Sequence, residues 1–350
     1  MSHGYRGVQW NRQKLIYDAI LIACVVLYLV IFNLATSWVS LDFDARGVSI
    51  RAYGSAAFIL LHVILSIGPL CRLNRRFLPL LYNRRHMGVT MFLLALNHAR
   101  LVLNWYHDFG NLEPKVSLLV SNLNYGSFIR FPFEILGVAG LLILFLMAAT
   151  SHDFWLANLT APIWKALHMM VYAAYALLVG HVVLGPLQSH THPLLAIAVA
   201  AGLIWITSIH LIAALKERKL DRPPPITADT DGFIDVGSTS EIPENRAKII
   251  TLAGERVAVF KYDGKIAAVS NACQHQNGPL GEGKIVSGCI TCPWHGYQYL
   301  PETGASPPPF TEKVPTFDVK VKGDRIFVNP QPHPAGTQAT PATLNREATP

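Results

Sequence analysis

The chain has 350 residues, which leaves room for two domains of ordinary size. Only 15% of the residues are charged and 51% are apolar, whereas soluble domains carry about 25% charged residues. This composition is not that of an ordinary soluble enzyme. The net charge of +7 lies in the connections between apolar segments and not on a basic face with interleaved aromatic residues, so we expect no nucleic-acid partner.

Six segments are apolar enough and long enough for a membrane-spanning helix, which needs about 20 mostly apolar residues. The first follows a basic N-terminal segment, residues 1–14, and is longer than the apolar core of a signal peptide, which has about 7–15 residues. We therefore predict an α-helical six-span transmembrane bundle over residues 15–215, in contact with membrane lipid. The predicted spans are residues 15–36, 53–71, 86–105, 131–150, 163–187 and 194–215.

The Lys and Arg residues predict the orientation of this bundle, because they gather on the cytoplasmic side of membrane proteins. They lie before the first span, between the second and third spans, and after the sixth. These groups are Arg6, Arg12 and Lys14; Arg72, Arg75, Arg76, Arg84 and Arg85; and Lys216, Arg218, Lys219 and Arg222. The opposite loops contain only Arg46, Arg51, Lys115 and Arg130. We predict an inner-membrane protein with both termini, and everything after residue 215, in the cytoplasm.

Histidines are the unusual content of these spans, because ionisable residues inside a membrane are costly and usually functional. His62 lies in the second span, His86 and His98 in the third, and His168 and His181 in the fifth. A single histidine in a span is usually explained by a hydrogen bond between helices. Several histidines in the same bundle favour a functional role instead. The two pairs are each separated by roughly 18–20 Å along a helix, so they form two levels, as two b haems with axial imidazoles require. Their spacing does not return to one face of an ideal helix, so the helices must tilt or bulge.

Two segments resemble the ferric reductase-like transmembrane domain, a family that includes ferric reductases and the membrane cores of NADPH oxidases. In "NRRHMGVTMFLLALNHARLVL" an RR-x-x-G pattern is followed ten residues later by a histidine. In "WKALHMMVYAAYALLVGHVVL" a W-x-x-x-H pattern is followed by a second histidine. Two interpretations of Arg84 and Arg85 stay open, as partners of haem propionates or as anchors on the cytoplasmic side.

This resemblance covers residues 15–215 and implies haem b, two haems in all, and electron transfer across the membrane. It implies that His98, His168 and His181 are haem ligands. His86 completes the set, although it lies inside the Arg-rich motif, where the family does not generally place a ligand. His62 is the alternative for this fourth position.

The chain changes character after the sixth span. Residues 216–230, "KERKLDRPPPITADT", predict a stiff linker with three consecutive prolines. Residues 231–329 alternate apolar and polar positions between turns such as "YDGK" and "KGDR", which predicts a small all-β domain. Residues 330–350 have few large apolar side chains, so we predict a disordered tail.

Two short motifs in the β domain each contain a cysteine and a histidine. They are "CQHQNGPL", with Cys273 and His275, and "CPWHG", with Cys292 and His295. Four such ligands could hold zinc or an iron–sulfur cluster. The split of one cysteine and one histidine per motif suits a [2Fe–2S] cluster with two thiolates on one iron and two imidazoles on the other.

The sequence strongly resembles the Rieske domain, in which "CPWHGYQY" would be the second ligand loop and "TGASPPPF" the proline loop. The resemblance implies that Cys273 and Cys292 bind one iron, and that His275 and His295 bind the other. Quinol-oxidising Rieske proteins carry an extra disulfide, and this chain has Gly278 and Trp294 in those places. It therefore resembles the ferredoxin type, which has a lower potential and needs no oxidising compartment.

Cys289 forms a C-x-x-C pattern with Cys292. The pattern suggests a second ligand or a redox pair. The alternative is that Cys289 belongs to the strand that leads into the ligand loop, and we favour this interpretation.

Membrane electron transfer is the function that these patterns favour, with an oxidoreductase activity like that of ferric reductases. A cytoplasmic Rieske cluster would take electrons from a soluble donor and pass them to the transmembrane haems. No G-x-G-x-x-G motif opens a βα unit, so the donor must be another protein, a reductase or a ferredoxin. Ferric ions, quinone, oxygen and a periplasmic protein stay open as acceptors.

Three other functions are weighed against electron transfer. A Rieske-dependent oxygenase component needs a mononuclear iron on two histidines and a carboxylate, and His190 and His192 lie in a short loop without such a set. A quinol-oxidising Rieske/cytochrome b-type subunit is disfavoured by the missing disulfide and the predicted cytoplasmic side. A redox-sensing module is the third alternative.

Overall fold

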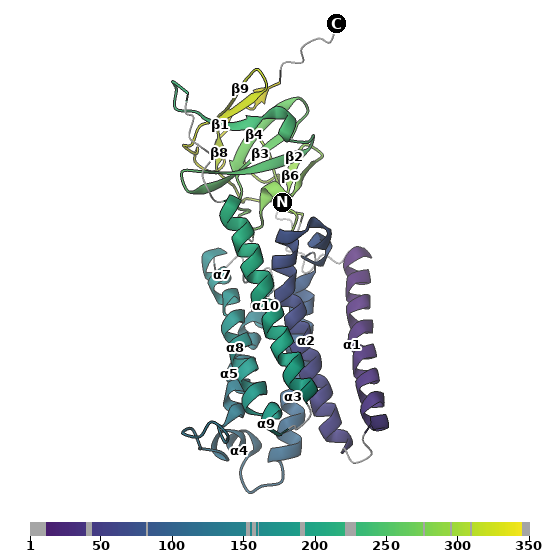
Figure 1. Ribbon diagram of the computed structural model, residues 1–350. Coiled ribbons are helices and arrows are strands. Elements are labelled where there is room, and N and C mark those ends of the chain that lie inside the picture. Colours follow the sequence, from purple (N-terminus) through teal and green to yellow (C-terminus); the bar gives the residue numbers. More distant parts are fainter. Residues whose placement is uncertain are drawn as a thin grey trace. The chain divides into compact units, whose positions relative to one another are not determined.

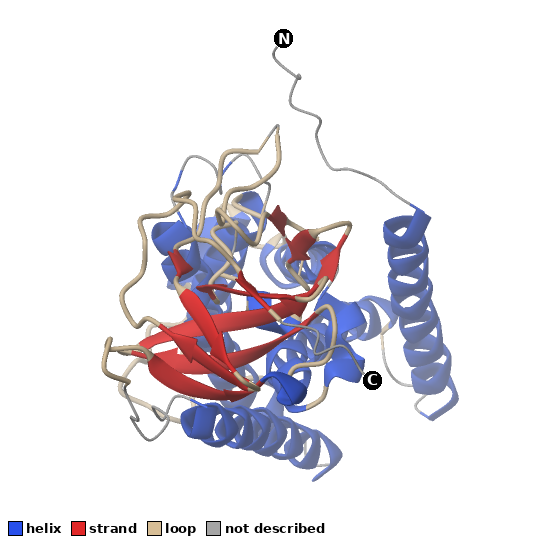
Figure 2. Ribbon diagram, turned by 90° about the horizontal axis from the view of Figure 1, so that it is seen from above, coloured by secondary structure: helices blue, strands red, loops and turns tan. Residues whose placement is uncertain are grey.

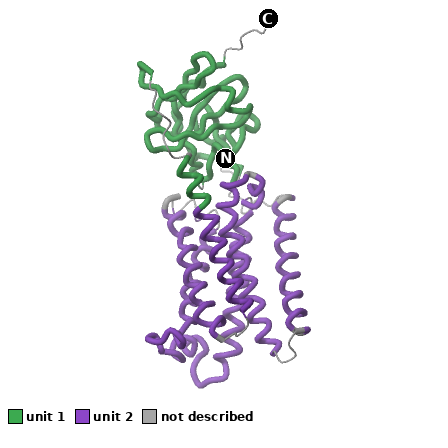
Figure 3. Tube along the Cα trace, in the orientation of Figure 1, with its two compact units in different colours: residues 1–5, 212–350 green, residues 6–211 purple. Residues whose placement is uncertain are grey.

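The computed structural model divides the chain into two compact units, residues 6–211 and residues 212–350, the latter grouped with residues 1–5 (Figure 3). The structure describes residues 12–39, 44–81, 83–151, 155, 159, 161–189, 193–220, 229–275, 277–294, 296–308 and 310–344. The predicted ligand His295 lies outside these residues, as do His190, His192 and most of the predicted linker. The two units are described separately below.

The first unit is a bundle of helices (Figure 1). Its long helices are α1 (Arg12–Val39), α2 (Ala45–Leu73), α3 (Arg84–Val102), α5 (Phe133–Ala149), α8 (Val171–Leu184) and α10 (Pro193–Leu220), which crosses the division between the units. Its shorter helices are the 3₁₀ helix Arg75–Leu81, the π-helical turn Leu103–His107, α4 (Pro114–Val120), α7 (Ala161–Met169) and α9 (Pro186–Ser189).

Five helical segments of the described chain are long and apolar enough to cross a membrane. They are Lys14–Thr36, Ala45–Leu73, Arg84–His107, Ile163–Gln188 and Pro193–Lys219. The sixth predicted span, residues 131–150, corresponds to α5, which is apolar but has only 17 residues. At 1.5 Å per residue α5 is about 26 Å long, slightly shorter than the hydrocarbon core of about 30 Å. The helical membrane bundle is confirmed, and five of the six spans meet the length criterion.

The second span is longer than its apolar pattern predicts. The sequence predicted a start near residue 53, whereas α2 begins at Ala45. The reason is an N-cap, because the Asp44 carboxylate accepts hydrogen bonds from the backbone N–H groups of Arg46 and Gly47. The cap lets the helix extend by two turns beyond the continuous apolar run.

The helices of the bundle associate in pairs. The closest packing joins α2 to α3 and α5 to α8. α1 lies at the edge of the bundle (Figure 1), and Leu21 is buried on it. The fifth predicted span is interrupted, because α7 ends at Met169 and α8 begins at Val171. The break falls between the two predicted haem ligands of this span, where a departure from ideal helical spacing was expected.

The second unit contains an all-β domain of antiparallel strands, drawn in red in Figure 2. Its strands are β1 (Ile234–Ser238), β2 (Arg246–Leu252), β3 (Glu255–Tyr262), β4 (Lys265–Ser270), β5 (Lys284–Val286), β6 (Cys289–Thr291), β7 (Gln298–Tyr299), β8 (Thr316–Phe317), β9 (Val319–Lys322), β10 (Arg325–Val328) and β11 (Ala342–Thr343). They form the sheets β1-β10-β9, β11-β4-β3-β2 with β8 beside β4, and β5-β6-β7. The small all-β domain is therefore confirmed.

The central strand β3 separates two apolar cores. Val257 and Val259 are buried in one core, while Ala258 and Phe260 are buried in the other. The second of these cores also contains the two predicted ligand cysteines. The β3–β4 turn has the predicted "YDGK" sequence, and Asp263 and Gly264 both have positive φ (46° and 69°), as the tightest hairpin turns require.

The prediction of a disordered tail is wrong for residues 330–344. Strand β11 pairs with β4, and the Ala339 N–H donates to the carbonyl of Glu302 at 2.8 Å. Composition misled the prediction, because this segment is held by backbone hydrogen bonds to the sheet and not by large apolar side chains. Residues 345–350 lie outside the described part of the chain.

Candidate metal centres

Two loops of the β domain begin at the predicted ligand cysteines. In the first loop the Cys273 N–H donates to the carbonyl of Gly278 at 2.9 Å, and the Asn277 N–H donates back to the carbonyl of Cys273 at 2.6 Å. Asn277 has φ 56°, a left-handed conformation that asparagine tolerates better than most residues. The loop therefore turns tightly around its cysteine.

The second loop repeats this arrangement. The Cys292 N–H donates to the carbonyl of Tyr297 at 2.7 Å, and the Gly296 N–H donates back to the carbonyl of Cys292 at 3.0 Å. Gly296 has φ 71°, which glycine adopts at no steric cost. Both loops thus use one residue with positive φ to close on a cysteine, and each loop presents one thiol.

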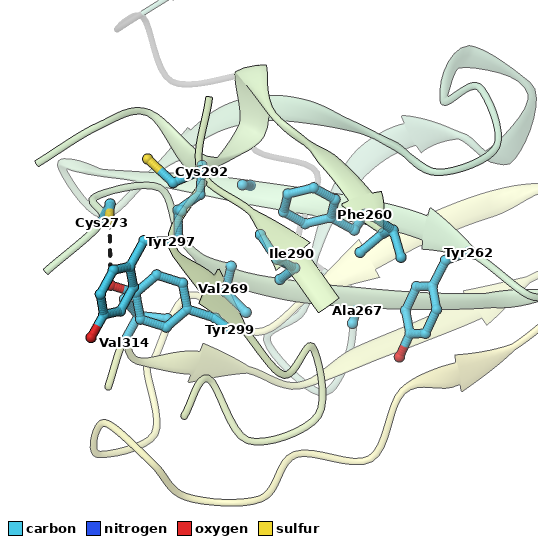
Figure 4. Close-up of a cluster of buried hydrophobic side chains, with 13 residues drawn as sticks. Phe260, Tyr262, Ala267, Val269, Cys273, Ile290, Cys292, Tyr297, Tyr299 and Val314 are labelled. Carbon is cyan, nitrogen blue, oxygen red and sulfur yellow. Dashed lines mark hydrogen bonds between the residues drawn. The ribbon is translucent and has the colours of Figure 1, made fainter. Parts of the chain in front are cut away.

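Both thiols are buried at the edge of the apolar core (Figure 4). Cys273 is 1% exposed and Cys292 is 2% exposed. The two loops touch at Gly278, where a Cβ atom would lie 2.7 Å from the Sγ of Cys292 and 3.2 Å from the Trp294 ring. The two positions that hold the extra cysteines of quinol-oxidising Rieske proteins are therefore in contact here, as glycine and tryptophan.

His275 belongs to the first loop and stacks on an aromatic ring. Its imidazole lies parallel to the Tyr297 ring, with a centroid separation of 4.9 Å and an angle of 10°. The Tyr297 hydroxyl donates a hydrogen bond to the carboxylate of Glu312. Burial, and then this carboxylate, raise the pKa of Tyr297. A neutral, anchored tyrosine thus fixes the plane of the His275 imidazole.

Tyr299 is a site residue that the sequence analysis missed. Its hydroxyl shares a hydrogen bond with the Sγ of Cys273 at 3.3 Å and accepts one from the Gln274 N–H at 3.1 Å (Figure 4). Burial, and then the neighbouring Cys273, raise the pKa of Tyr299, so the phenol keeps its proton and remains a donor. The second tyrosine of "CPWHGYQY" was the available signal, but its direction could not be read from the sequence.

Cys289 lies on the strand that precedes the second loop. It is half-buried on β6, where it pairs with Val286 of β5. Burial raises the pKa of its thiol, which disfavours the thiolate that binds metals. These observations favour the interpretation of Cys289 as a strand residue.

The described part of this site offers two thiols and one imidazole from facing loops. This donor set fits a [2Fe–2S] cluster, because thiolates hold iron–sulfur clusters and imidazoles replace two of them in Rieske centres. The fourth predicted ligand, His295, lies in the second loop but outside the described residues.

In the membrane unit, His98 and His181 each form one hydrogen bond to a backbone carbonyl of a neighbouring helix. The Nδ1–H of His98 on α3 donates to the carbonyl of Ile50 on α2 at 2.9 Å. The Nδ1–H of His181 on α8 donates to the carbonyl of Phe133 at the start of α5, at 3.0 Å. A carbonyl can only accept, so each Nδ1 carries the proton and each Nε2 carries the lone pair that binds metals.

The two arrangements form an internal repeat that the sequence analysis did not detect. In both, histidine and carbonyl are 48 residues apart, and a glycine follows the carbonyl residue by four positions. A Cβ atom at Gly54 would lie 2.9 Å from the Nδ1 of His98, and one at Gly137 would lie 2.8 Å from the Nδ1 of His181. The absence of a side chain on both glycines lets each imidazole rest against the neighbouring helix.

The structure brings His98 and His181 together. Their ring centroids are 6.4 Å apart and the rings are nearly perpendicular, at 86°. Two metal–nitrogen bonds of about 2 Å, with about 1 Å from each nitrogen to its ring centre, give about 6 Å. The two imidazoles would therefore be able to hold one iron between them.

His168 presents a second available nitrogen. Its Nδ1–H donates to the carbonyl of Trp164 at 3.0 Å, and the Trp164 ring stacks on the imidazole at 3.8 Å. Its Nε2 is buried and has no hydrogen-bond partner among the described residues. A buried polar atom without a partner is costly, so this nitrogen fits a metal ligand. The charges of Arg84 and Arg85 are near enough to act on the imidazole.

The two candidates for the fourth ligand differ in their surroundings. His86, at the start of α3, pairs through Nδ1 with the carboxylate of Asp18 at 2.8 Å. His62 donates from Nδ1 to the carbonyl of Phe58 at 2.8 Å, and its Nε2 accepts from the hydroxyl of Tyr175 at 3.1 Å. Both nitrogens of His62 therefore have protein partners, as expected of a histidine that joins helices.

Comparison with known families agrees with this description. A family model of the Rieske [2Fe–2S] domain matches residues 232–318, and one of the ferric reductase like transmembrane component matches residues 53–179. The second match includes His98 and His168 and ends two residues before His181. The chain thus belongs to the Rieske [2Fe–2S] family through its C-terminal domain, which is fused to a ferric reductase-like membrane domain. It is an integral membrane protein of electron transfer.

The relatives match part of this chain. The ferredoxin component of the naphthalene 1,2-dioxygenase system of Pseudomonas aeruginosa is 31% identical over 101 residues, 29% of this chain and 97% of that protein. The cholesterol 7-desaturase nvd of Xenopus laevis is 39% identical over 102 residues, 28% of this chain and 22% of that protein. This chain therefore spans about a fifth of the desaturase. The ferredoxin of carbazole 1,9a-dioxygenase from Nocardioides aromaticivorans IC177 is a solved structure with 27% identity, a TM-score of 0.27 and coverage of 28% of this chain and 98% of that one.

Proposed function

We propose that this protein carries electrons from a cytoplasmic protein donor, through a Rieske [2Fe–2S] cluster, to transmembrane b haems and an acceptor in or beyond the membrane. The observation that carries the proposal is the pairing of His98 with His181, whose Nδ1 atoms are both tied to carbonyls while their rings are 6.4 Å apart. When bound, both kinds of group supply one-electron carriers.

In the β domain, Cys273 and Cys292 hold one iron, and His275 and His295 hold the other. The burial of both thiols and the contact between the two loops at Gly278 support this assignment. The Tyr299 hydroxyl donates to the Sγ of Cys273 and so stabilises negative charge on the sulfur.

In the membrane domain, we assign two haems. His98 and His181 hold the outer one, and His168 and His86 hold the inner one. The available Nε2 of His168 supports this inner site. His62 is the alternative inner ligand, and it would first have to give up its hydrogen bond to Tyr175.

The proposed location is the inner membrane, with both termini and the Rieske domain in the cytoplasm. The distribution of Lys and Arg in the sequence supports this orientation. One of the relatives above is the ferredoxin component of a dioxygenase system, so a reductase or another ferredoxin is the proposed donor. Ferric ions, quinone, oxygen and a periplasmic protein remain the candidate acceptors.

The direction of transfer can be tested in membrane vesicles of defined orientation. In inverted vesicles a reduced protein donor, which cannot cross the membrane, should reduce the cluster and then both haems. In right-side-out vesicles the same donor should have no effect, while an impermeant ferric chelate should reoxidise haem that was reduced beforehand. Equal reduction from both sides would show that the proposed orientation is wrong.

A further inference from the structure

A carboxylate lies inside the apolar helix α1, at Asp18. Its side chain is 14% exposed. The Nδ1 of His86 lies 2.8 Å from Oδ2 of Asp18 and 3.0 Å from the amide nitrogen of Asn83, and this amide donates to Oδ1 at 2.6 Å. Because a carboxylate accepts hydrogen bonds, we assign the proton to Nδ1. An acidic residue within a membrane span is costly and is usually retained for a function. The sequence shows an acid in this span but not its partner, because His86 belongs to another helix.

Asp18 distinguishes His86 from the other three proposed haem ligands. The Nδ1–H groups of His98, His168 and His181 all donate to neutral backbone carbonyls. The Nδ1–H of His86 donates to an anion. A carboxylate in this position makes an imidazole more basic, orients its ring and fixes the proton on Nδ1, so that Nε2 faces the metal as a stronger donor.

We propose that Asp18 is the positioning residue of the inner haem, and that it lowers the reduction potential of that haem through His86. This inference rests on the proposed function. A more basic ligand and a nearby negative charge both stabilise ferric iron more than ferrous iron. The direction of the effect therefore follows from the hydrogen bond alone.

Asp18 acts against Arg84 and Arg85, which lie beside His86 in the sequence and whose charges reach the proposed inner ligand His168. Two cations near an iron favour its ferrous form and would retain an electron at the inner site. The negative charge of Asp18, acting through the proposed ligand His86, offsets the positive charges of these two arginines. Its consequence for function is that an electron at the inner haem is released more easily toward the outer one.

The test is a redox titration of the purified full-length protein, followed through its visible haem bands, in the wild type and in Asp18→Asn. The substitution keeps the size of the side chain and removes the charge. We expect one of the two midpoint potentials to rise, with a change of about tenfold in its reduction equilibrium, or 59 mV for one electron. The other potential should stay in place, and it should be the one that disappears in His98→Ala.

Asp44→Asn is the matched control, because it removes the same charge from the N-cap of α2, where asparagine also caps well. It should move neither potential. Asp18→Glu keeps a carboxylate, so its potentials should stay within about threefold of the wild-type equilibrium, which separates the effect of the charge from that of changing the side chain.

The outcomes separate this inference from the proposed function. A wild-type protein without haem contradicts both. Two haems with unchanged potentials in Asp18→Asn contradict the role of Asp18 alone, as does a rise in Asp18→Glu equal to that in Asp18→Asn. If only the midpoint potential of the haem that depends on His98 changes, Asp18 acts on the outer haem and the inference is wrong.

Discussion

The β domain and the helical bundle hold their candidate metal ligands in opposite ways. In the β domain each loop carries its ligands within a few residues, and backbone hydrogen bonds close the loop on its own cysteine. In the bundle, the imidazoles of His98 and His181 are each oriented by a carbonyl 48 residues away on another helix. A local loop can preserve its site through a short motif, whereas a site between helices depends on packing over the whole bundle.

The largest expected effect is the loss of the iron–sulfur centre in Cys292→Ser. Because metal binding in a small domain is coupled to folding, this variant should lose the cluster and destabilise the β domain by several kcal/mol. The membrane haems should remain, because their ligands belong to the other unit. Labile sulfide, iron and haem content measure the two effects separately. Retention of labile sulfide in the variant would remove Cys292 from the ligand set.

The second expected effect concerns the pair between the helices. His98→Ala and His181→Ala should each remove the same haem, because the two rings face one another at 6.4 Å. His62→Ala should keep two haems, because both nitrogens of His62 are occupied by protein groups. Haem quantification distinguishes these variants. If His62→Ala loses a haem while His86→Ala keeps two, the inner ligand is His62.

The third prediction tests the glycines that hold the two imidazoles against neighbouring helices. Gly54→Ala and Gly137→Ala would place a Cβ 2.9 and 2.8 Å from an Nδ1 atom, so each should push its histidine aside. We expect a cost of about 1–3 kcal/mol and weaker binding of the outer haem. Gly68→Ala is the matched control on α2, because nothing lies within 4 Å of its Cβ. Equal haem affinity in Gly54→Ala and Gly68→Ala would contradict this account.

The smallest expected effect is at the cluster. Tyr299→Phe removes the hydrogen bond to the Sγ of Cys273, which stabilises the more negative reduced state. Losing a bond of about 1 kcal/mol should lower the cluster potential by about 40 mV. Tyr262→Phe is the control, because the buried Tyr262 hydroxyl has no hydrogen-bond partner in the described part of the structure. The cluster potential is measured by an EPR-monitored titration. If Tyr299→Phe and Tyr262→Phe have the same cluster potential, Tyr299 does not tune the cluster.

The difference between the two regions also explains what could be predicted from the sequence. The thiols and His275 could be proposed as ligands because a short motif holds them at fixed spacing. The membrane histidines could be proposed from their depth in apolar spans, which requires no knowledge of packing. The bonds from His98 to Ile50 and from His181 to Phe133 could not be found, because they depend on which helices become neighbours.

The errors have physical causes as well. The start of α2 was placed too late because the analysis followed the apolar run and not the cap at Asp44. Residues 330–344 were predicted as disordered because composition does not report backbone pairing such as that of β11 with β4. Asp18 was missed because its partner His86 belongs to another helix. In each case the decisive interaction is polar and, except at Asp44, distant in sequence.

The most direct test of the account is the reduction of haem by a protein donor in wild type and in Cys292→Ser, with haem content matched between the two. The donor should be able to reduce the haems but should react with those of the isolated membrane domain too slowly to do so within the time of the measurement. We predict that the haem bands of the wild type are reduced after the cluster signal, and that those of Cys292→Ser stay oxidised. Haem reduction at equal rates in both proteins would contradict the claim that electrons enter through the Rieske cluster.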